Sequence, residues 1–425
     1  MASKFEKRAR RIRRVVRRWP VVEPLVSRAG AALWRRHLRR QVAQSHAGVD
    51  PSRLLWVDPA KVHWRLRSAA VRELIPGSTR SAIGQVLGGD WDRDVEPIDA
   101  HPFIAAARER YVEGKAWDDT DFAAQMRERI EREGPQHRYR TPEDIARLGK
   151  RWDELADHIR TQGYRSQDEL GTGKPWEEVL VAFDRVGRVI FVEGVHRFAI
   201  ARALGVEQIP VRVAVRHQDW YRFSGEVRAY VNEVQGGRAY QPLLHPDLAD
   251  VPFSHDGERF DLILDALPVR EGRLLDIGAN WGYFCHRFEE VGFTPVASER
   301  SEKQLYFLTG LRDALERRFD IWGGSITEVK DLGEFDVVLA LNVFHHFLKS
   351  ESSYLELLTL LRRLRARYLV FEPHLPDERQ MQRAYRNPGP DEFRKLVQQE
   401  TGLTGYSQIG TAGHGRPIYL LHGGS

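Results

Sequence analysis

The sequence predicts an α/β protein with two domains behind a basic N-terminal arm. Two observations predict this organisation. Residues 255–425 alternate apolar runs with amphipathic stretches, which is typical of a parallel sheet covered by helices. Residues 178–216 show the same alternation on a smaller scale, and the proline-bearing stretch 238–257 between them is typical of a linker. A chain of 425 residues is also long for a single hydrophobic core.

The elements follow from periodicity and from capping residues. Thr141 followed by Pro142, Glu143 and Asp144 predicts a helix start, and Gly88–Asp92 predicts a turn. In the N-terminal half we expect strands at 54–57, 62–66, 179–183, 188–192 and 210–215, with helices at 104–113, 122–133, 142–163, 194–204 and 219–234. In the C-terminal half we expect strands at 273–277, 295–299, 320–323, 335–341, 368–371, 406–409 and 417–421, with helices at 283–291, 301–317, 354–365 and 391–401. The predicted domains are therefore 1–45, 46–245 and 246–425.

Composition narrows the class of protein. Apolar residues make up 42% and charged residues 29%, which is ordinary for a globular protein. The single cysteine, Cys285, excludes an internal disulfide framework and a multi-cysteine metal site, and it fits a reducing compartment. The sequence has no apolar run of about 20 residues that could span a membrane, and no apolar secretory signal. We therefore expect a cytoplasmic protein that could also bind peripherally to a membrane.

The positive charge is concentrated in the arm. Residues 1–40 contain 14 Lys and Arg against two Glu, so this segment carries +12 and the rest of the chain carries −7. Its two short helical stretches, 4–19 and 29–41, each have a narrow apolar side. Such an arm suits an anionic membrane surface or a nucleic acid. It is equally compatible with a solvated helix that packs its apolar side on the body of the protein.

The most informative stretch is 273–299, RLLDIGANWGYFCHRFEEVGFTPVASE. It reads as strand, glycine-bearing turn, helix and second strand with an acid at its end, which is half of a mononucleotide-binding unit. Glycines allow a tight turn, the helix start presents free N–H groups, and an acid about 20 residues on can accept hydrogen bonds from ribose hydroxyls. The residues that this pattern assigns to a nucleotide-like cofactor are Asp276, Gly278, Asn280, Gly282 and Glu299.

The spacing of the glycines argues against two common kinds of nucleotide site. A dinucleotide fingerprint needs glycine at the first, third and sixth positions, but Gly278 is followed there by Asn280 and Tyr283. A phosphate-binding loop would need Gly-Lys-Ser/Thr, which is absent. The pattern Asp-x-Gly-Ala-Asn-x-Gly instead resembles motif I of class I S-adenosylmethionine (SAM)-dependent methyltransferases. Its Gly-Ala-Asn form is similar to that of the FkbM-type O-methyltransferases. The resemblance covers residues 255–425 and implies a Rossmann-like, seven-stranded domain that binds SAM.

The resemblance also implies further site residues. It places Ser325 and Ile326 beside the adenine, although Asp is common at the first position, and Asn342 at the cleft after the fourth strand. His345 and His346 follow directly, and imidazoles that titrate near neutral pH can act as general bases. His374 is a second choice. The pair could instead serve packing and capping. No set of His, Asp and Glu at ligand spacing accompanies it, so we expect no metal.

A second resemblance lies in the N-terminal half. The sequence VEGVHRFAIARALGVEQIPVRV is similar to the ParB/sulfiredoxin fold, in which an acidic-Gly-x-His/Arg-Arg turn caps a helix and binds nucleotide phosphates. A helix start flanked by His and Arg is a natural anion site. The resemblance implies that Gly194, His196 and Arg197 contact phosphate and that Glu193 is the acidic partner, where Asp is commoner. Alternatively, His196 and Arg197 only stabilise the turn.

Three functions remain open from the sequence. The favoured one is a SAM-dependent methyltransferase that methylates an oxygen of a sugar, glycan or other small or lipid-linked acceptor, with an N-terminal recognition domain. The first rival is an RNA or DNA methyltransferase that grips phosphates through the arm and the ParB-like domain. Against it, the Asn/Asp-Pro-Pro-Tyr/Phe signature of amino-methylating nucleic-acid enzymes is missing. The second rival is a ParB-like nucleotide-dependent switch or kinase whose C-terminal domain senses SAM.

Overall fold

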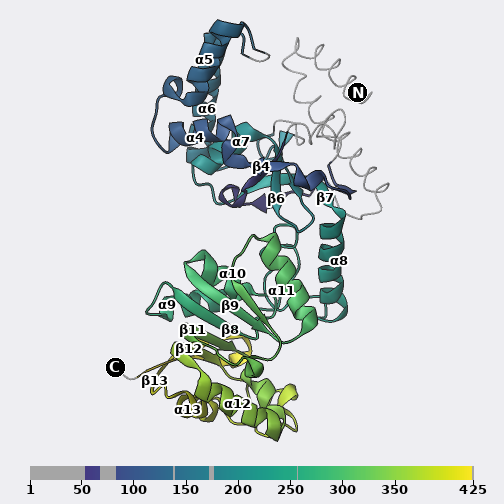
Figure 1. Ribbon diagram of the computed structural model, residues 1–425, viewed down its shortest axis with the longest axis vertical. Coiled ribbons are helices and arrows are strands. Elements are labelled where there is room, and N and C mark those ends of the chain that lie inside the picture. The colour runs from purple at the N-terminus through teal and green to yellow at the C-terminus, as the bar shows by residue number, and fades with distance from the viewer. Residues whose placement is uncertain (1–52, 68–82, 137–138, 172–176, 256, 424–425) are drawn as a thin grey trace. The chain divides into compact units, whose positions relative to one another are not determined.

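The computed structural model describes residues 53–67, 83–136, 139–171, 177–255 and 257–423 (Figure 1). The predicted basic arm, 1–45, lies outside the described residues. The chain divides into two compact units, Met1–Phe223 and Ser224–Ser425. The division falls within helix α8 (Gln218–Glu233), ahead of the linker expected at 238–257.

The first unit contains a mixed seven-stranded sheet. Its strand order is β1-β7-β5-β6-β2-β4, and β3 pairs with a second part of β7. Strand β7 lies inside the sheet and is buried along its whole length, so both faces of the sheet are covered at this strand. The strands are β1 (Leu55–Val57), β2 (Trp64–Leu66), β3 (Gln85–Leu87), β4 (Val95–Pro97), β5 (Val179–Phe183), β6 (Val189–Glu193) and β7 (Ile209–His217). The mixed α/β class expected for this half is confirmed.

Among the described residues of the first unit, four helices precede α8: α4 (Pro102–Tyr111), α5 (Asp121–Glu133), α6 (Pro142–Gln162) and α7 (Val195–Ala203). Helix α6 begins where the capping residues predict, because Oδ2 of Asp144 accepts a hydrogen bond from the backbone N–H of Thr141 at 3.2 Å. The helices meet through aromatic rings. The ring of Trp117 packs at a tilt against that of Trp152, with centroids 5.2 Å apart, and its Nε1 donates to the carbonyl of Ile145 at 2.9 Å.

The second unit contains the seven-stranded sheet that the sequence predicts. The strand order is β10-β9-β8-β11-β12-β14-β13, and all pairings are parallel except those of β14, which runs antiparallel to both neighbours. The strands are β8 (Gly272–Ile277), β9 (Phe293–Glu299), β10 (Asp320–Gly323), β11 (Glu334–Leu341), β12 (Arg365–Glu372), β13 (Gly405–Thr411) and β14 (Pro417–His422).

Helices cover both faces of this second sheet (Figure 1). On β11, Val337 and Leu339 pack in one core with α9 and α10, whereas Val338 and Ala340 pack in another with α12 and α13. The helices are α9 (Glu258–Ala266), α10 (Tyr283–Glu290), α11 (Glu302–Ala314), α12 (Glu351–Arg363) and α13 (Pro390–Thr401). The chain leaves β8 toward β9 and leaves β11 toward β12, so the strand order reverses between β8 and β11. Ligands of open α/β sheets bind outside the carboxyl ends of the strands at such a point.

Gly149 in α6 gives a test of the packing in the first unit. A Cβ at this position would lie 2.2 Å from Cδ1 of Trp117. We therefore expect Gly149→Ala to lower the free energy of unfolding by about 1–3 kcal/mol through overpacking, despite the better helix propensity of alanine. Denaturant unfolding of the full chain measures the change. Gly225→Ala in α8 is the matched control, because its Cβ meets nothing within 4 Å, and it should stabilise by about 0.5–1 kcal/mol. Equal effects of the two substitutions would contradict the packing described for Trp117.

Candidate active site

The turn after β8 is held against the neighbouring strand β9. The backbone N–H groups of Gly278 and Ala279 both donate to the carbonyl of Ser298, at 2.8 and 3.0 Å. Gly278 has φ of 78°, and a Cβ there would lie 2.7 Å from Cγ2 of Val343. Both the left-handed backbone and the close approach of Val343 therefore require glycine at this position.

Glu299 joins the turn to the end of β9. Its Oε2 accepts a hydrogen bond from the backbone N–H of Asn280 at 3.0 Å, and its Oε1 accepts one from the N–H of Ser301 at 2.8 Å. The carboxylate is half-buried, so each oxygen keeps a second acceptor site. The structure thus brings together five of the residues that the sequence assigns to the cofactor: Asp276, Gly278, Asn280, Gly282 and Glu299.

Asp276 lies at the end of β8 and is only 3% exposed. Burial raises the pKa of its carboxyl to about 7, the charge of Glu299 acts in the same direction, and the hydrogen bond from Cys285 and the charge of Arg259 oppose the rise. The Cys285 thiol donates to Oδ2 at 3.8 Å. A positive charge bound near this buried carboxyl would lower its pKa and so favour its ionised form.

The three remaining cofactor candidates follow the ends of β10 and β11. Ser325 precedes a short 3-10 turn, its hydroxyl lies 2.8 Å from that of Thr327, and Ile326 is buried. The backbone N–H of Gly324 donates to the carbonyl of Glu299 at 3.1 Å, which holds this segment beside β9. Ser325 and Ile326 therefore directly follow Gly324, which is hydrogen-bonded to Glu299 at the end of β9.

Asn342 adopts a left-handed backbone with φ of 53°. This conformation is uncommon outside glycine, although Asn tolerates it better than most residues. Its N–H donates to the carbonyl of Glu372 at 3.0 Å, and its Nδ2 donates to the hydroxyl of Tyr240 at 3.2 Å. Its Oδ1 is buried and has no hydrogen-bond partner among the described residues.

The adjacent histidines occupy different environments. His345 is 2% exposed, and neither ring nitrogen has a hydrogen-bond partner in the described part of the chain. Burial, together with the charges of nearby cations, lowers its pKa to about 3. His346 is exposed, and its ring centroid lies 4.1 Å from that of His345. Desolvation of the ring and the charges of Lys349 and Arg300 lower the pKa of His346, so its ring is neutral at pH 7.

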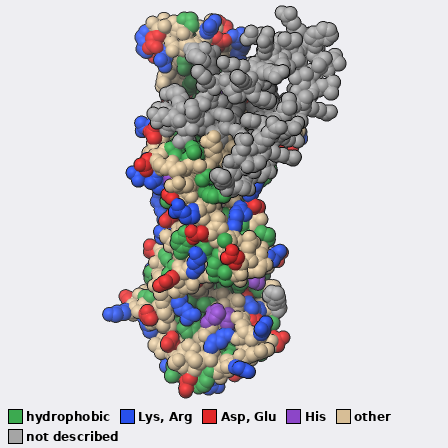
Figure 2. Space-filling model, turned by 90° about the vertical axis from the view of Figure 1, so that its right-hand side faces the viewer, with side chains coloured by type: hydrophobic (Ala, Val, Ile, Leu, Met, Phe, Trp, Pro, Cys, Tyr) green, Lys and Arg blue, Asp and Glu red, His purple; other side chains and the backbone are tan. Residues whose placement is uncertain are grey.

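His374, the second choice for a base, is fully buried. Its Nε2 lies 3.0 Å from Oδ1 of Asn387, and desolvation lowers its pKa. Of the three histidines, only His346 presents its ring to solvent. Figure 2 shows histidine side chains among lysine and arginine side chains on the surface of the second unit.

Sequence reasoning missed a buried ion-pair network beside these histidines. Glu372, at the end of β12, is 1% exposed and accepts from Nη1 of Arg259 at 2.9 Å and from Nη1 of Arg416 at 3.4 Å. Arg416 also binds Glu378 through two nitrogens, at 2.6 and 2.9 Å. Although burial raises the pKa of Glu378, the hydrogen bonds from Arg416 and from its other partners lower it to about 2. These residues come from separated segments, so no local motif could have indicated them.

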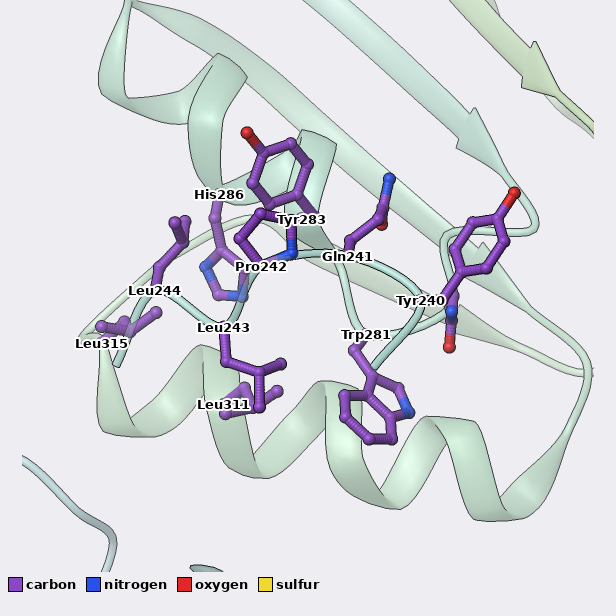
Figure 3. Close-up of a pocket in the computed structure, with 11 residues that line it drawn as sticks. Tyr240, Gln241, Pro242, Leu243, Leu244, Trp281, Tyr283, His286, Leu311 and Leu315 are labelled. Carbon is purple, nitrogen blue, oxygen red and sulfur yellow. The ribbon is translucent and has the colours of Figure 1, made fainter. Parts of the chain in front are cut away.

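A pocket opens next to the turn of β8 (Figure 3). The segment 240–244 lines one part of it, and the turn after β8, α10 and the end of α11 line the rest. Trp281 is fixed at its side because its Nε1 donates to Oε1 of Gln304, whose Nε2 donates to the hydroxyl of Tyr230 at 2.9 Å. The lining residues are Tyr240, Gln241, Pro242, Leu243, Leu244, Asn280, Trp281, Tyr283, His286, Leu311 and Leu315.

In the first unit the predicted phosphate-binding residues surround the start of α7. Gly194, with φ of 99°, precedes the helix, and Glu193 ends β6. Nδ1 of His196 accepts a hydrogen bond from Nε1 of Trp152 at 2.9 Å. Arg197 pairs with the buried Glu178 at 3.3 Å. These internal contacts are compatible with either interpretation of the turn, so phosphate binding stays a prediction.

Two further expectations concern metal binding and membrane-spanning helices. Within the described ranges, no group of three or more His, Cys, Asp or Glu could hold a metal ion. In the same part of the chain, no helix has the length and apolar character that crossing a bilayer requires.

Comparison with known proteins gives structural matches only. No protein-family model and no curated protein matches the sequence. The bifunctional kinase-methyltransferase WbdD is similar over 46% of this chain and 45% of its own, with 25% identity and a TM-score of 0.38. The PH0226 protein from Pyrococcus horikoshii OT3 and a SAM-dependent methyltransferase from Aquifex aeolicus are each 16% identical over 39% of this chain, covering 87% and 88% of their own chains, with TM-scores of 0.30. The chain therefore spans less than half the length of WbdD.

The buried histidines predict a dependence of stability on pH. Burial lowers the pKa of both His286 and His345 to about 3. Burial also lowers the pKa of His346 and His374. Below the usual pKa of about 6.5, the unfolded chain therefore binds at least two protons that the folded chain excludes. The raised pKa of Asp276 opposes one of them, because the folded carboxyl holds a proton there that the unfolded one has released. We expect the free energy of unfolding to fall by at least about 1.4 kcal/mol per pH unit as the pH is lowered from 6.5 to 5.

His286→Phe should lower this slope by about 1.4 kcal/mol per pH unit, because one excluded proton is lost, and Asp276→Asn should raise it by about the same amount. The slope of the free energy of unfolding against pH is measured by denaturant unfolding of the full chain at several pH values, with hydrogen exchange of the β11 amides as the readout for the second unit. His422→Phe is the control, since this ring lies at the end of β14 and is half-exposed. An unchanged slope in His286→Phe would show that the ring is not held neutral by burial.

Proposed function

We propose that the second unit is a class I SAM-dependent methyltransferase. The observation that carries the proposal is the hydrogen bond from the Asn280 N–H to Glu299, which joins the glycine-bearing turn to the acid at the end of the adjacent strand. The turn lies where the strand order reverses, at the carboxyl edge of the sheet. A ribose above Glu299 would find a carboxylate with free acceptor sites, and a cation beside Asp276 would favour ionisation of its carboxyl.

The protein's own part in the chemistry is to orient an acceptor and remove its proton. When bound, SAM supplies a methyl group that its sulfonium centre already makes strongly electrophilic. His346 is the residue we assign to proton removal, because its ring is exposed and neutral at pH 7. His345, the other predicted base, is buried against it and is better placed to fix the orientation of the His346 ring.

The acceptor class rests on the sequence and on local charge. The Gly-Ala-Asn form of the turn favours transfer to an oxygen of a sugar, glycan or other small or lipid-linked acceptor. Lys349 and Arg300 act electrostatically on His346 and are both exposed, so an acceptor that carries negative charge would be attracted to this base. The arm at 1–45 would then hold the enzyme at an anionic membrane surface.

The first unit is proposed as a recognition domain. The three first N–H groups of α7, Gly194 before them and the half-buried Arg197 would bind a phosphate group of the acceptor or of a nucleotide. The same arrangement supports the rival functions, a nucleic-acid methyltransferase or a nucleotide-dependent switch.

Binding of SAM is the first test. We expect the full chain to bind SAM and Glu299→Gln to weaken that binding about 10- to 100-fold, because one acceptor for the ribose hydroxyls is lost. Isothermal titration calorimetry measures the affinity. Glu302→Gln is the matched control, since Glu302 is three residues away, exposed and in the first turn of α11. Failure of the unmodified protein to bind SAM would refute the proposal, and equal affinities of the two variants would remove Glu299 from the site.

Transfer of a labelled methyl group is the second test. With tritiated SAM and a fractionated cell extract, we expect label in the small-molecule or lipid fraction. His346→Gln should lower the initial rate by about 10²- to 10⁴-fold with little change in the affinity for SAM. Label in the RNA or DNA fraction would support the nucleic-acid rival instead. His422→Gln serves as the control, and a normal rate in His346→Gln would exclude this residue as the base.

A further inference from the structure

Arg259 is a buried arginine with only part of its guanidinium paired. It lies on α9, its side chain is 6% exposed, and its Nη1 donates to Oε2 of Glu372 at 2.9 Å. Its guanidinium lies between the rings of Tyr240 and Phe284, 5.8 and 5.6 Å from their centroids. Its Nε and Nη2 are buried and have no hydrogen-bond partner among the described residues. Burying donors of a charged group without a partner is costly, so such an arrangement calls for a ligand.

The unpaired nitrogens belong to one edge of the guanidinium. Nε–H and one N–H of Nη2 point in the same direction and match the two oxygens of a carboxylate. This protein uses the same edge elsewhere. Arg416 binds Glu378 through Nε and Nη2 at 2.6 and 2.9 Å, and Arg110 binds Asp153 through Nε and Nη2, both at 3.1 Å. Arg259 therefore presents, on its free edge, the geometry that binds a carboxylate in two other places of the chain.

Unpaired acceptors accompany this unpaired donor edge. Tyr240, whose ring lies against Arg259, accepts a hydrogen bond from Nδ2 of Asn342. Oδ1 of Asn342 and Oδ1 of Asn280 are buried and, within the described residues, have no partner. Asn280 and Tyr240 line the same pocket (Figure 3), and the charge of Arg259 also acts on Asp276. A donor edge and two acceptors are thus gathered at the turn that ends β8.

We propose that Arg259 binds the carboxylate at the amino-acid end of SAM, and that Oδ1 of Asn342 and Asn280 accept hydrogen bonds from its ammonium group. This inference rests on the proposed function. The amino-acid end of the cofactor is a zwitterion, so it needs donors and acceptors side by side, which is what the structure gathers around Tyr240. Glu372 is a positioning residue in this arrangement, because it holds Nη1 and leaves the Nε–Nη2 edge turned away from itself.

The decisive comparison uses two ligands that differ only in the carboxylate. SAM and decarboxylated SAM share the adenosine, the sulfonium and the ammonium. We expect the unmodified full chain to bind SAM about 10- to 100-fold more tightly than decarboxylated SAM. Arg259→Gln should lose most of this preference by weakening only the binding of SAM. Arg259→Lys should keep part of it, because the charge remains but the two-pronged geometry is lost. Calorimetric titration measures all six affinities.

The controls separate this inference from the proposed function. 5′-Methylthioadenosine lacks the whole amino-acid end, so equal binding by the unmodified protein and Arg259→Gln would show that the variant is folded and retains its adenosine site. Arg362→Gln, an exposed arginine on α12 paired with Glu400, should leave every affinity unchanged. If the unmodified protein binds none of the three ligands, the proposed function fails.

If SAM binds but Arg259→Gln weakens SAM and decarboxylated SAM equally, the inference about Arg259 is wrong while the proposed function stands. Should the variant fail to fold, the unmodified protein still decides the matter. Equal affinities for SAM and decarboxylated SAM would overturn the inference, because no group in the site would then distinguish the carboxylate.

Discussion

The site of the second unit depends on the hydrogen bonds that the carboxylate of Glu299 accepts. With one oxygen it fixes the turn after β8, and with the other it fixes the start of α11. The carbonyl of its neighbour Ser298 holds the same turn through two further bonds. The turn therefore cannot move without breaking these hydrogen bonds to the end of β9. A ligand that meets both the turn and the carboxylate finds them already positioned, which lowers the entropy lost on binding.

Around this fixed centre the protein buries charge in compensated groups. Glu372 and Glu378 are matched by Arg259 and Arg416, so the network as a whole is neutral. Buried ion pairs contribute little net stability, because desolvation offsets their attraction. Their value here is geometric, since each guanidinium is held in one orientation. His345, by contrast, avoids the cost of a buried charge by remaining neutral.

The local sequence pattern predicted most strands and helices, but it did not predict Arg259 or which of the adjacent histidines is buried. Strands β5 and β10 have the bounds expected from the sequence, and the seven strands of the second sheet were all anticipated. Strands β3 and β4 were not, because these three-residue strands flank the glycine- and aspartate-rich turn at 88–92, whose composition hides them. Helix α9 was missed beside the proline-bearing linker, and with it Arg259. Adjacent histidines could be found from the sequence, but which of them is buried depends on contacts made by distant segments.

The reversed direction of β14 has a consequence for how such a domain can change over time. The parallel strands of the sheet end at the ligand edge, whereas the antiparallel strand β14 begins there. Arg416, just before β14, therefore lies at this edge and contacts Glu372 and Glu378. The connection between β13 and β14 can therefore change around Arg416 at this edge, while β8 and β9 keep the turn after β8 in place. Under the proposed function, selection could alter the acceptor through this one hairpin and leave the cofactor site intact.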